Sequence, residues 1–103
     1  MLDANLSIVK MFKKQVGKRI DVAKMIFFGS RANGGFTKDS DFDLLVVSKD
    51  FEGLNKSKRS PVLHMIWGFD YPVDLLCYTP KEFRRSLNGI NIASEAARNG
   101  IVI

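Results

Sequence analysis

Residues 23–48 read AKMIFFGSRANGGFTKDSDFDLLVVS and contain the two segments around which the rest of the chain is expected to fold. Ala23–Phe28 is a short apolar run that ends at a Gly-Ser pair, which is typical of a buried strand followed by a turn. Asp41–Ser48 is a second strand, and its Leu-Leu-Val-Val half is apolar on both faces, as expected of a central strand. The stretch therefore predicts two neighbouring strands with polar residues at their ends.

Apolar residues recur at helical spacing through the first twenty positions, and lysines occupy most of the remaining faces. This pattern predicts an amphipathic helix that packs on the sheet by one face. The residues of that face are Leu2, Leu6, Val9, Phe12, Val16 and Ile20.

Helices and a third strand are expected after the second strand. A proline suited to a first helical turn predicts a short helix over about residues 61–67, and residues 72–78 predict the third strand. Thr79 and Glu82 form a capping-box pattern at the start of the next helix. A last helix is expected over about residues 91–99, ending at a glycine.

The composition is that of one globular domain. At 103 residues the chain is long enough to bury one core, and a hydrophobic fraction of 46% excludes a disordered tail. The order of helices and strands predicts the α/β (α+β) class, with a small mixed β-sheet covered by helices. We expect a single domain over residues 1–103.

Charge and cysteine content bear on location and partners. Cys77 is the single cysteine, and no apolar run approaches the about 20 residues of a membrane span, so the chain is expected to be cytoplasmic with no membrane association. A net charge of +5 favours encounters with polyanions, and Lys56, Lys58 and Arg59 are a candidate nucleic-acid contact. Nucleic-acid binding is not favoured, because no aromatic residues alternate with these cations.

Asp41 and Asp43 are the first candidate functional pair. Residues two apart on a strand face the same side, about 7 Å apart, so the two carboxylates would lie together. They would repel unless a cation lies between them, and oxygen ligands suit Mg²⁺ or Mn²⁺. The alternative is a solvated strand edge. A calcium-binding EF-hand is excluded, because Leu44 occupies the position that requires glycine.

Gly29 and Ser30 lie where the first strand gives way to a short helix. Free N–H groups and a hydroxyl at that point predict a phosphate cradle, although an ordinary strand-to-helix turn has the same residues. Arg31 could pair with the phosphate or be a surface arginine. A phosphate cradle beside paired carboxylates is what metal-assisted phosphoryl transfer requires.

Asp74 is the candidate third carboxylate. It lies among apolar residues within the third strand, where an acidic side chain needs a reason. If this strand pairs beside the one carrying Asp41 and Asp43, the three carboxylates can complete a site for two metal ions. Asp39 and Asp70 are expected in loops.

Together these residues resemble the signature of a known family. Gly29-Ser30, ten residues and Asp41-Phe42-Asp43 are similar to the G-S-x10-D-x-D motif of the minimal nucleotidyltransferases in the DNA polymerase β-like superfamily. Residues 71–76 (YPVDLL) resemble the strand with the third aspartate, and residues 92–102 (IASEAARNGIV) resemble the C-terminal segment. The resemblance extends from about Phe12 to the end.

This resemblance implies a polymerase β-like nucleotidyltransferase fold and transfer of a nucleoside monophosphate, with two Mg²⁺ (or Mn²⁺) ions and ATP as substrate. Asp41 and Asp43 would bind both ions. Asp74 would bind one ion and help to activate the attacking hydroxyl. Gly29 and Ser30 would hold the triphosphate.

The resemblance also implies a partner. Short chains of this kind are often encoded beside HEPN-domain proteins and act as their antitoxins, and some transfer AMP from ATP onto a tyrosine of the partner. A homo-oligomer and a hetero-oligomer are both compatible with the sequence, which does not determine the oligomeric state. Two alternatives remain, namely a non-catalytic antitoxin that neutralises its partner by complex formation, and transfer to a small-molecule acceptor. Asn33 replaces an arginine common in the family, which removes one phosphate contact.

Overall fold

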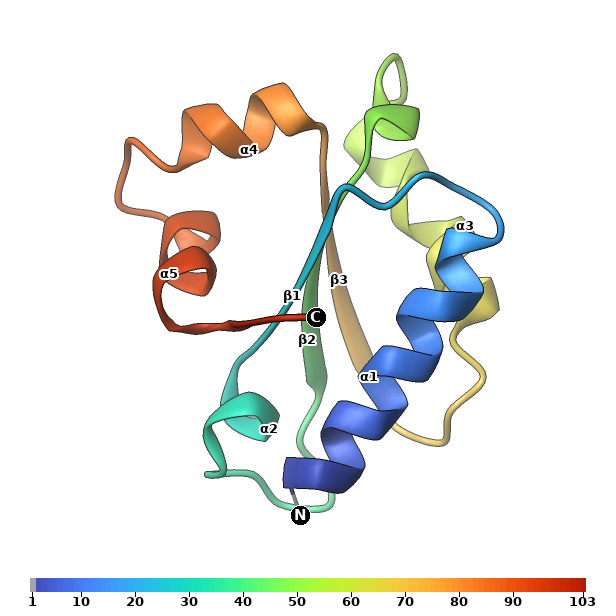
Figure 1. Cartoon of the computed structure of the whole chain (residues 1–103), viewed down its shortest axis with the longest axis vertical. Helices are drawn as coiled ribbons and strands as arrows, with labels where there is room; N and C mark the ends of the chain where they lie inside the picture. Colours follow the sequence, from blue (N-terminus) through green and yellow to red (C-terminus); the bar gives the residue numbers. More distant parts are fainter. Residues whose placement is uncertain (1) are drawn as a thin grey trace.

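The computed structural model describes residues 2–103, with side chains from residue 4 onward. In chain order the elements are α1 (Leu2–Gly17), β1 (Lys24–Phe28), α2 (Ser30–Asn33), β2 (Phe42–Val47), the short 3-10 helices η1 (Lys49–Phe51) and η2 (Lys56–Lys58), α3 (Ser60–Ile66), β3 (Val73–Tyr78), α4 (Pro80–Ser86), α5 (Ile92–Asn99) and β4 (Ile101–Val102) (Figure 1).

The described strands form one mixed sheet of four strands in the order β3-β2-β1-β4. β1 pairs antiparallel with β2 and with β4, whereas β2 and β3 are parallel. The long connection that a parallel pair requires contains α3. This topology brings the N-terminal ends of β2 and β3 together, beside the C-terminal end of β1.

Helices cover both faces of the sheet (Figure 1). α1 and α3 lie on one face, over a core to which α1 contributes Val9, Phe12 and Val16, each with no exposed surface. α4 and α5 lie on the other face, over a second core that includes Ile26 and Leu45. The predicted fold class is therefore confirmed. Within residues 2–103, none of the helices has the length and apolar character that crossing a membrane requires.

The predicted helices and strands form, with small shifts at their ends. The three predicted strands are each present, and both Thr79 and Glu82 make the hydrogen bonds of the capping box. Leu6 and Ile20 pack against the core as predicted, while the side chain of Leu2 lies outside the described residues.

The sequence did not predict β4 as a strand. Two residues are too short to show any periodicity, and they become a strand only because β1 has an unpaired edge. Val102 pairs with Ile26, and Ile101 pairs with Phe27.

Candidate functional site

Asp43 and Asp74 lie opposite each other where β2 and β3 begin, since the parallel register pairs these two residues. Paired residues of adjacent strands face the same side of a sheet, with backbones about 5 Å apart. Asp41 precedes β2, and the Phe42 N–H donates to the Pro72 carbonyl at 2.9 Å, which continues the strand pairing to this point. Asp41 is two residues before Asp43 and so shares its face.

The surroundings of the Asp43 carboxyl disfavour its ionised form. Its pKa is raised from 3.8 to about 6, first by burial and then by the negative charges of Asp74 and Asp41. Asp43 is half-buried, whereas Asp41 and Asp74 are exposed. The raised pKa thus reflects burial together with repulsion from two neighbouring carboxylates, and a bound cation would relieve the repulsion.

Gly29 lies against the Asp43 carboxylate and leaves no room for a side chain. Its φ is +81°, and a Cβ atom at this position would overlap the Oδ2 atom of Asp43. The register agrees, because the preceding residue, Phe28, pairs with Asp43 across β1 and β2. Glycine is required here on conformational and steric grounds, so the turn and the carboxylates share one edge of the sheet.

Ser30 begins α2, which has only one turn. The Gly34 N–H donates to the Ser30 carbonyl at 3.0 Å, and the helix geometry leaves the N–H groups of Ser30 and Arg31 without an intrahelical acceptor. These N–H groups and the Ser30 hydroxyl are the donors that the turn presents near the carboxylates. The phosphate contacts of Gly29 and Ser30 stay a prediction.

The Arg31 side chain is buried and donates hydrogen bonds to groups of the protein itself. It is therefore not a surface arginine, and its phosphate contact stays a prediction. Its side chain is 3% exposed. Its Nε donates to the Ser40 carbonyl at 2.8 Å, and one Nη donates to the Lys38 carbonyl at 3.1 Å. The other Nη donates to Oδ1 of Asn5 at 3.2 Å. The guanidinium also lies over three aromatic rings, those of Phe36, Phe42 and Tyr71.

Through these contacts Arg31 connects the Gly-Ser turn to the segment that leads to Asp41. The carbonyls that it binds lie within residues 37–40, and the Thr37 N–H in turn donates to Oγ of Ser40 at 2.9 Å. A buried guanidinium that donates to protein acceptors cannot reach a phosphate without breaking them. An arginine after Gly-Ser looks the same in the sequence whether it binds a phosphate or binds carbonyls of the protein. Only the tertiary contacts distinguish these two roles.

A cavity of about 510 Å³ opens beside the Gly-Ser turn. This volume lies in the range of about 300–1,000 Å³ typical of small-molecule sites. No sequence motif pointed to Glu95 and Asn99, although their spacing of four residues places them on one face of α5. The residues that line the cavity are Phe28, Gly29, Asn33, Glu95, Ala96 and Asn99.

The three aspartates suit a divalent cation in chemistry, but they do not form a closed cage. Carboxylate oxygens are the ligands that Mg²⁺ prefers, and the raised pKa of Asp43 marks negative charge that a cation would neutralise. Among the side chains that the structure describes, no group of three or more His, Cys, Asp or Glu is placed to hold a metal ion. Asp41 and Asp74 are exposed, so their side chains have room to turn toward Asp43.

Two solved structures show similar folds. One is a Sulfolobus solfataricus protein provisionally described as a nucleotidyltransferase, with 25% sequence identity, a TM-score of 0.66, and coverage of 82% of this chain and 75% of that chain. The other is BolA1 from Arabidopsis thaliana, with 18% identity, a TM-score of 0.57, and coverage of 73% of this chain and 94% of that chain. The likeness to BolA1 concerns the fold alone.

Sequence comparison identifies the family. A search of curated proteins found no match. The family model described as the nucleotidyltransferase domain matches residues 9–99, which is most of the chain. Domains of this family generally use a nucleoside triphosphate and a divalent metal ion. Because this match includes the Gly-Ser turn and all three aspartates, we conclude that the chain belongs to the nucleotidyltransferase domain family, whose general activity is nucleotidyl transfer.

Proposed function

We propose that this protein transfers AMP from ATP to a hydroxyl group of a partner protein, with two Mg²⁺ ions, and that the partner is a HEPN-domain toxin. The observation that carries the proposal is the register of Asp43 with Asp74 beside Gly29. Family membership supports nucleotidyl transfer in general. The choice of AMP, of a protein acceptor and of an antitoxin role rests on the resemblance described above.

Each residue of the site has a distinct task in this reaction. Asp41 and Asp43 would hold both metal ions, Asp74 would hold one, and the bound ions would neutralise the phosphates and the leaving pyrophosphate. The N–H groups of the Gly29-Ser30 turn would hold the triphosphate. Asp74 would accept the proton of the acceptor hydroxyl. The hydroxyl oxygen would form a bond to the α-phosphorus of ATP while the bond from that phosphorus to pyrophosphate breaks.

The exposure of the site supports a macromolecular acceptor. Asp41 and Asp74 are exposed at the sheet edge, so a hydroxyl carried on another protein can approach them. An open site of this kind favours an acceptor that brings its own binding surface.

The test is transfer of label from ATP labelled in the α-phosphate to a HEPN-domain protein, the partner that we propose. With Mg²⁺, we expect the label on the partner. Asp43→Asn should reduce the rate by at least about 100-fold, because it removes charge where the transition state is stabilised electrostatically. Asp70→Asn is the matched control, since Asp70 is an exposed aspartate expected in a loop. A well-folded wild-type protein that labels no protein acceptor would refute the proposal.

One observation favours a second candidate function, that of a non-catalytic antitoxin. Arg31 is committed to protein acceptors and Asn33 is uncharged, so neither supplies a cation for a triphosphate. If complex formation alone neutralises the partner, the double variant Asp41→Asn, Asp43→Asn should still suppress toxicity. Return of toxicity in that variant, with the complex intact, would exclude this second candidate.

A further inference from the structure

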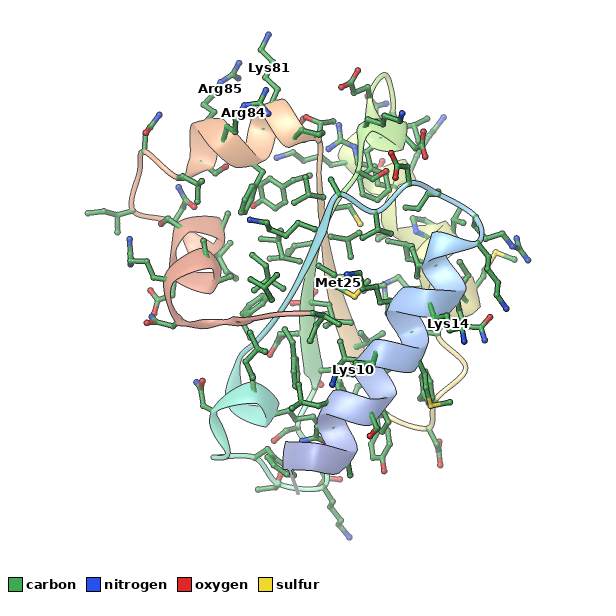
Figure 2. The ribbon with its side chains drawn as sticks, in the orientation of Figure 1. Lys10, Lys14, Met25, Lys81, Arg84 and Arg85 are labelled. Atoms are coloured by element: carbon green, nitrogen blue, oxygen red, sulfur yellow. The ribbon has the colours of Figure 1, made fainter. Side chains whose placement is uncertain are left out.

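Basic side chains gather at the end of the sheet opposite to the carboxylates. β2 and β3 run in parallel from Asp43 and Asp74 toward α4. β3 extends about 13 Å beyond Asp74 at about 3.3 Å per residue, and α4 begins two residues after β3 ends. Figure 2 shows three of these basic residues on α4. We name as the α4 basic patch the exposed side chains of Lys24, Lys56, Lys58, Lys81, Arg84 and Arg85.

Specific contacts bring these segments of the chain together. The Lys24 Nζ lies 5.7 Å from the centre of the Phe83 ring, which places the start of β1 beside α4. Arg59 follows η2 directly and binds Glu82 of α4, with an Nη to Oε1 distance of 2.6 Å. The patch is therefore a property of the fold, and its members come from β1, η2 and α4.

No member of the patch forms a salt bridge with another described residue. Among the described residues, the ion pairs are Lys49 with Asp21 and Arg59 with Glu82, and neither includes a member of the patch. Glu82, the one acidic residue of α4, binds Arg59 and is also within electrostatic range of Lys56. Asp21, Asp50 and Glu52 are the other acids near these positions in sequence, and the six basic side chains of the patch outnumber these acids.

We propose that the α4 basic patch binds the phosphate backbone of a nucleic acid, independently of base sequence. Four of the six members are lysines, which protein interfaces tend to avoid and which bind phosphate as point charges. The patch has no aromatic platform for stacked bases, because Phe83 is buried and lysines lie over the rings of Phe83 and Tyr78. A duplex is the favoured form, since its backbone is bound without stacking of bases on aromatic side chains, and duplex RNA is the probe used in the test.

This site is separate from the proposed transferase site, so the two proposals can fail independently. Binding is measured by fluorescence anisotropy with a short labelled duplex RNA of mixed sequence, in a series of salt concentrations. The test variant carries Lys81→Gln, Arg84→Gln and Arg85→Gln. The matched control carries Lys10→Gln, Lys14→Gln and Lys18→Gln, which removes the same net charge from exposed positions on and just after α1. Lys10 and Lys14 are labelled in Figure 2.

We expect wild-type protein to bind the duplex with a steep salt dependence of about −0.9 in log–log slope for each phosphate contact. The α4 variant should bind at least about tenfold more weakly, with a slope shallower by up to about 3, whereas the α1 control should change by less than about threefold. Circular dichroism establishes that both variants are folded.

Three results would overturn the proposal. The first is no binding by the wild-type protein at physiological salt. The second is an equal loss in both variants, which would mean that only net charge matters. The third is displacement of the RNA by polyglutamate at equal charge concentration, which would assign the patch to acidic proteins.

Discussion

At the scale of single residues, the site depends on how Asp43 is surrounded. The carboxyl lies against the backbone of Gly29. Burial, followed by the negative charges of Asp74 and Asp41, raises its pKa to about 6. A group whose pKa is higher in the folded than in the unfolded state stabilises the fold only while it is protonated. Asp43 therefore costs stability at neutral pH when no cation is bound.

Asp43→Asn is accordingly expected to raise the stability of the metal-free protein at about pH 7.5, while it abolishes transfer. The gain should shrink as the pH falls through about 6 toward 3.8, because the wild-type carboxyl then becomes protonated in the folded state. The measurement is the thermal midpoint in the presence of a chelator across this pH range, with Asp70→Asn as control. A variant that is no more stable than wild type at pH 7.5 would contradict the assigned repulsion.

Arg31→Met should destabilise the protein by about 2–4 kcal/mol, because it leaves several carbonyls and the Asn5 amide without their donor. Arg31→Lys should recover only part of this, since an ammonium cannot reproduce the planar fork. Urea unfolding gives the free energy, and hydrogen exchange of residues 35–41 reports on the segment that Arg31 holds. Arg98→Met, at an exposed position of α5, is the control and should be near neutral. Equal effects of the two methionine variants would exclude the structural role of Arg31.

At the scale of elements, two interactions that share Glu82 stabilise the start of α4. Thr79 and Glu82 form the capping box, and the Glu82 carboxylate also binds the buried guanidinium of Arg59. The hydrogen bond to Arg59 is the main reason why the pKa of Glu82 is lowered from 4.5 to about 2. Arg59 itself donates to the carbonyls of Leu54 and Cys77, so it anchors the loop before α3. It is thus not part of a nucleic-acid contact, in contrast to the expectation from its basic neighbours.

Glu82→Gln should destabilise the protein by about 1–3 kcal/mol at pH 7, because Arg59, at 6% exposure, keeps its charge without the carboxylate. A carboxyl with a lowered pKa in the folded state contributes stability above its unfolded value, which is lost as the pH falls. The difference between wild type and variant should therefore hold above about pH 4.5 and vanish toward pH 2. Chemical unfolding at several pH values measures it, with Glu52→Gln as an exposed control. A difference that does not depend on pH would speak against the ion pair.

At the scale of the whole molecule, the end of the chain completes the sheet. β4 covers the edge of β1, the Ile103 N–H donates to the Met25 carbonyl at 2.9 Å, and Lys13 of α1 donates to the Ile103 carbonyl at 2.6 Å. The last three residues therefore link the sheet edge to α1. Without them β1 would present unpaired backbone groups, which is a site for aggregation.

Deletion of residues 101–103 should lower the free energy of unfolding by about 2–4 kcal/mol, because it removes two half-buried isoleucines and the strand pairing. We also expect concentration-dependent aggregation, detected by light scattering, from the exposed β1 edge. Val102→Thr is the matched control, since Val102 is 60% exposed and its side chain faces solvent. A truncated chain as stable and as dispersed as wild type would show that β4 is dispensable.

Local patterns were sufficient for the family and for the helices and strands other than β4. The helical spacing of Val9, Phe12 and Val16, the apolar runs of β1 and β2, and the capping box of α4 are each encoded within a few residues. The Gly-Ser pair and the Asp-x-Asp spacing are local as well. Such signals are visible in a sequence because they depend on backbone geometry and on neighbours within one or two turns.

The tertiary structure alone decided which distant groups meet. The sheet order places Asp74 beside Asp43, although they are 31 positions apart, and the same topology assembles the α4 basic patch from three segments. Packing between elements buries Arg31 and Arg59 and leaves neighbouring lysines exposed, although all of these residues are basic in the sequence. The sequence determined the elements and their chemistry, because those depend on short-range interactions. Partners, burial and pKa values depend on packing between elements, which a local pattern does not contain.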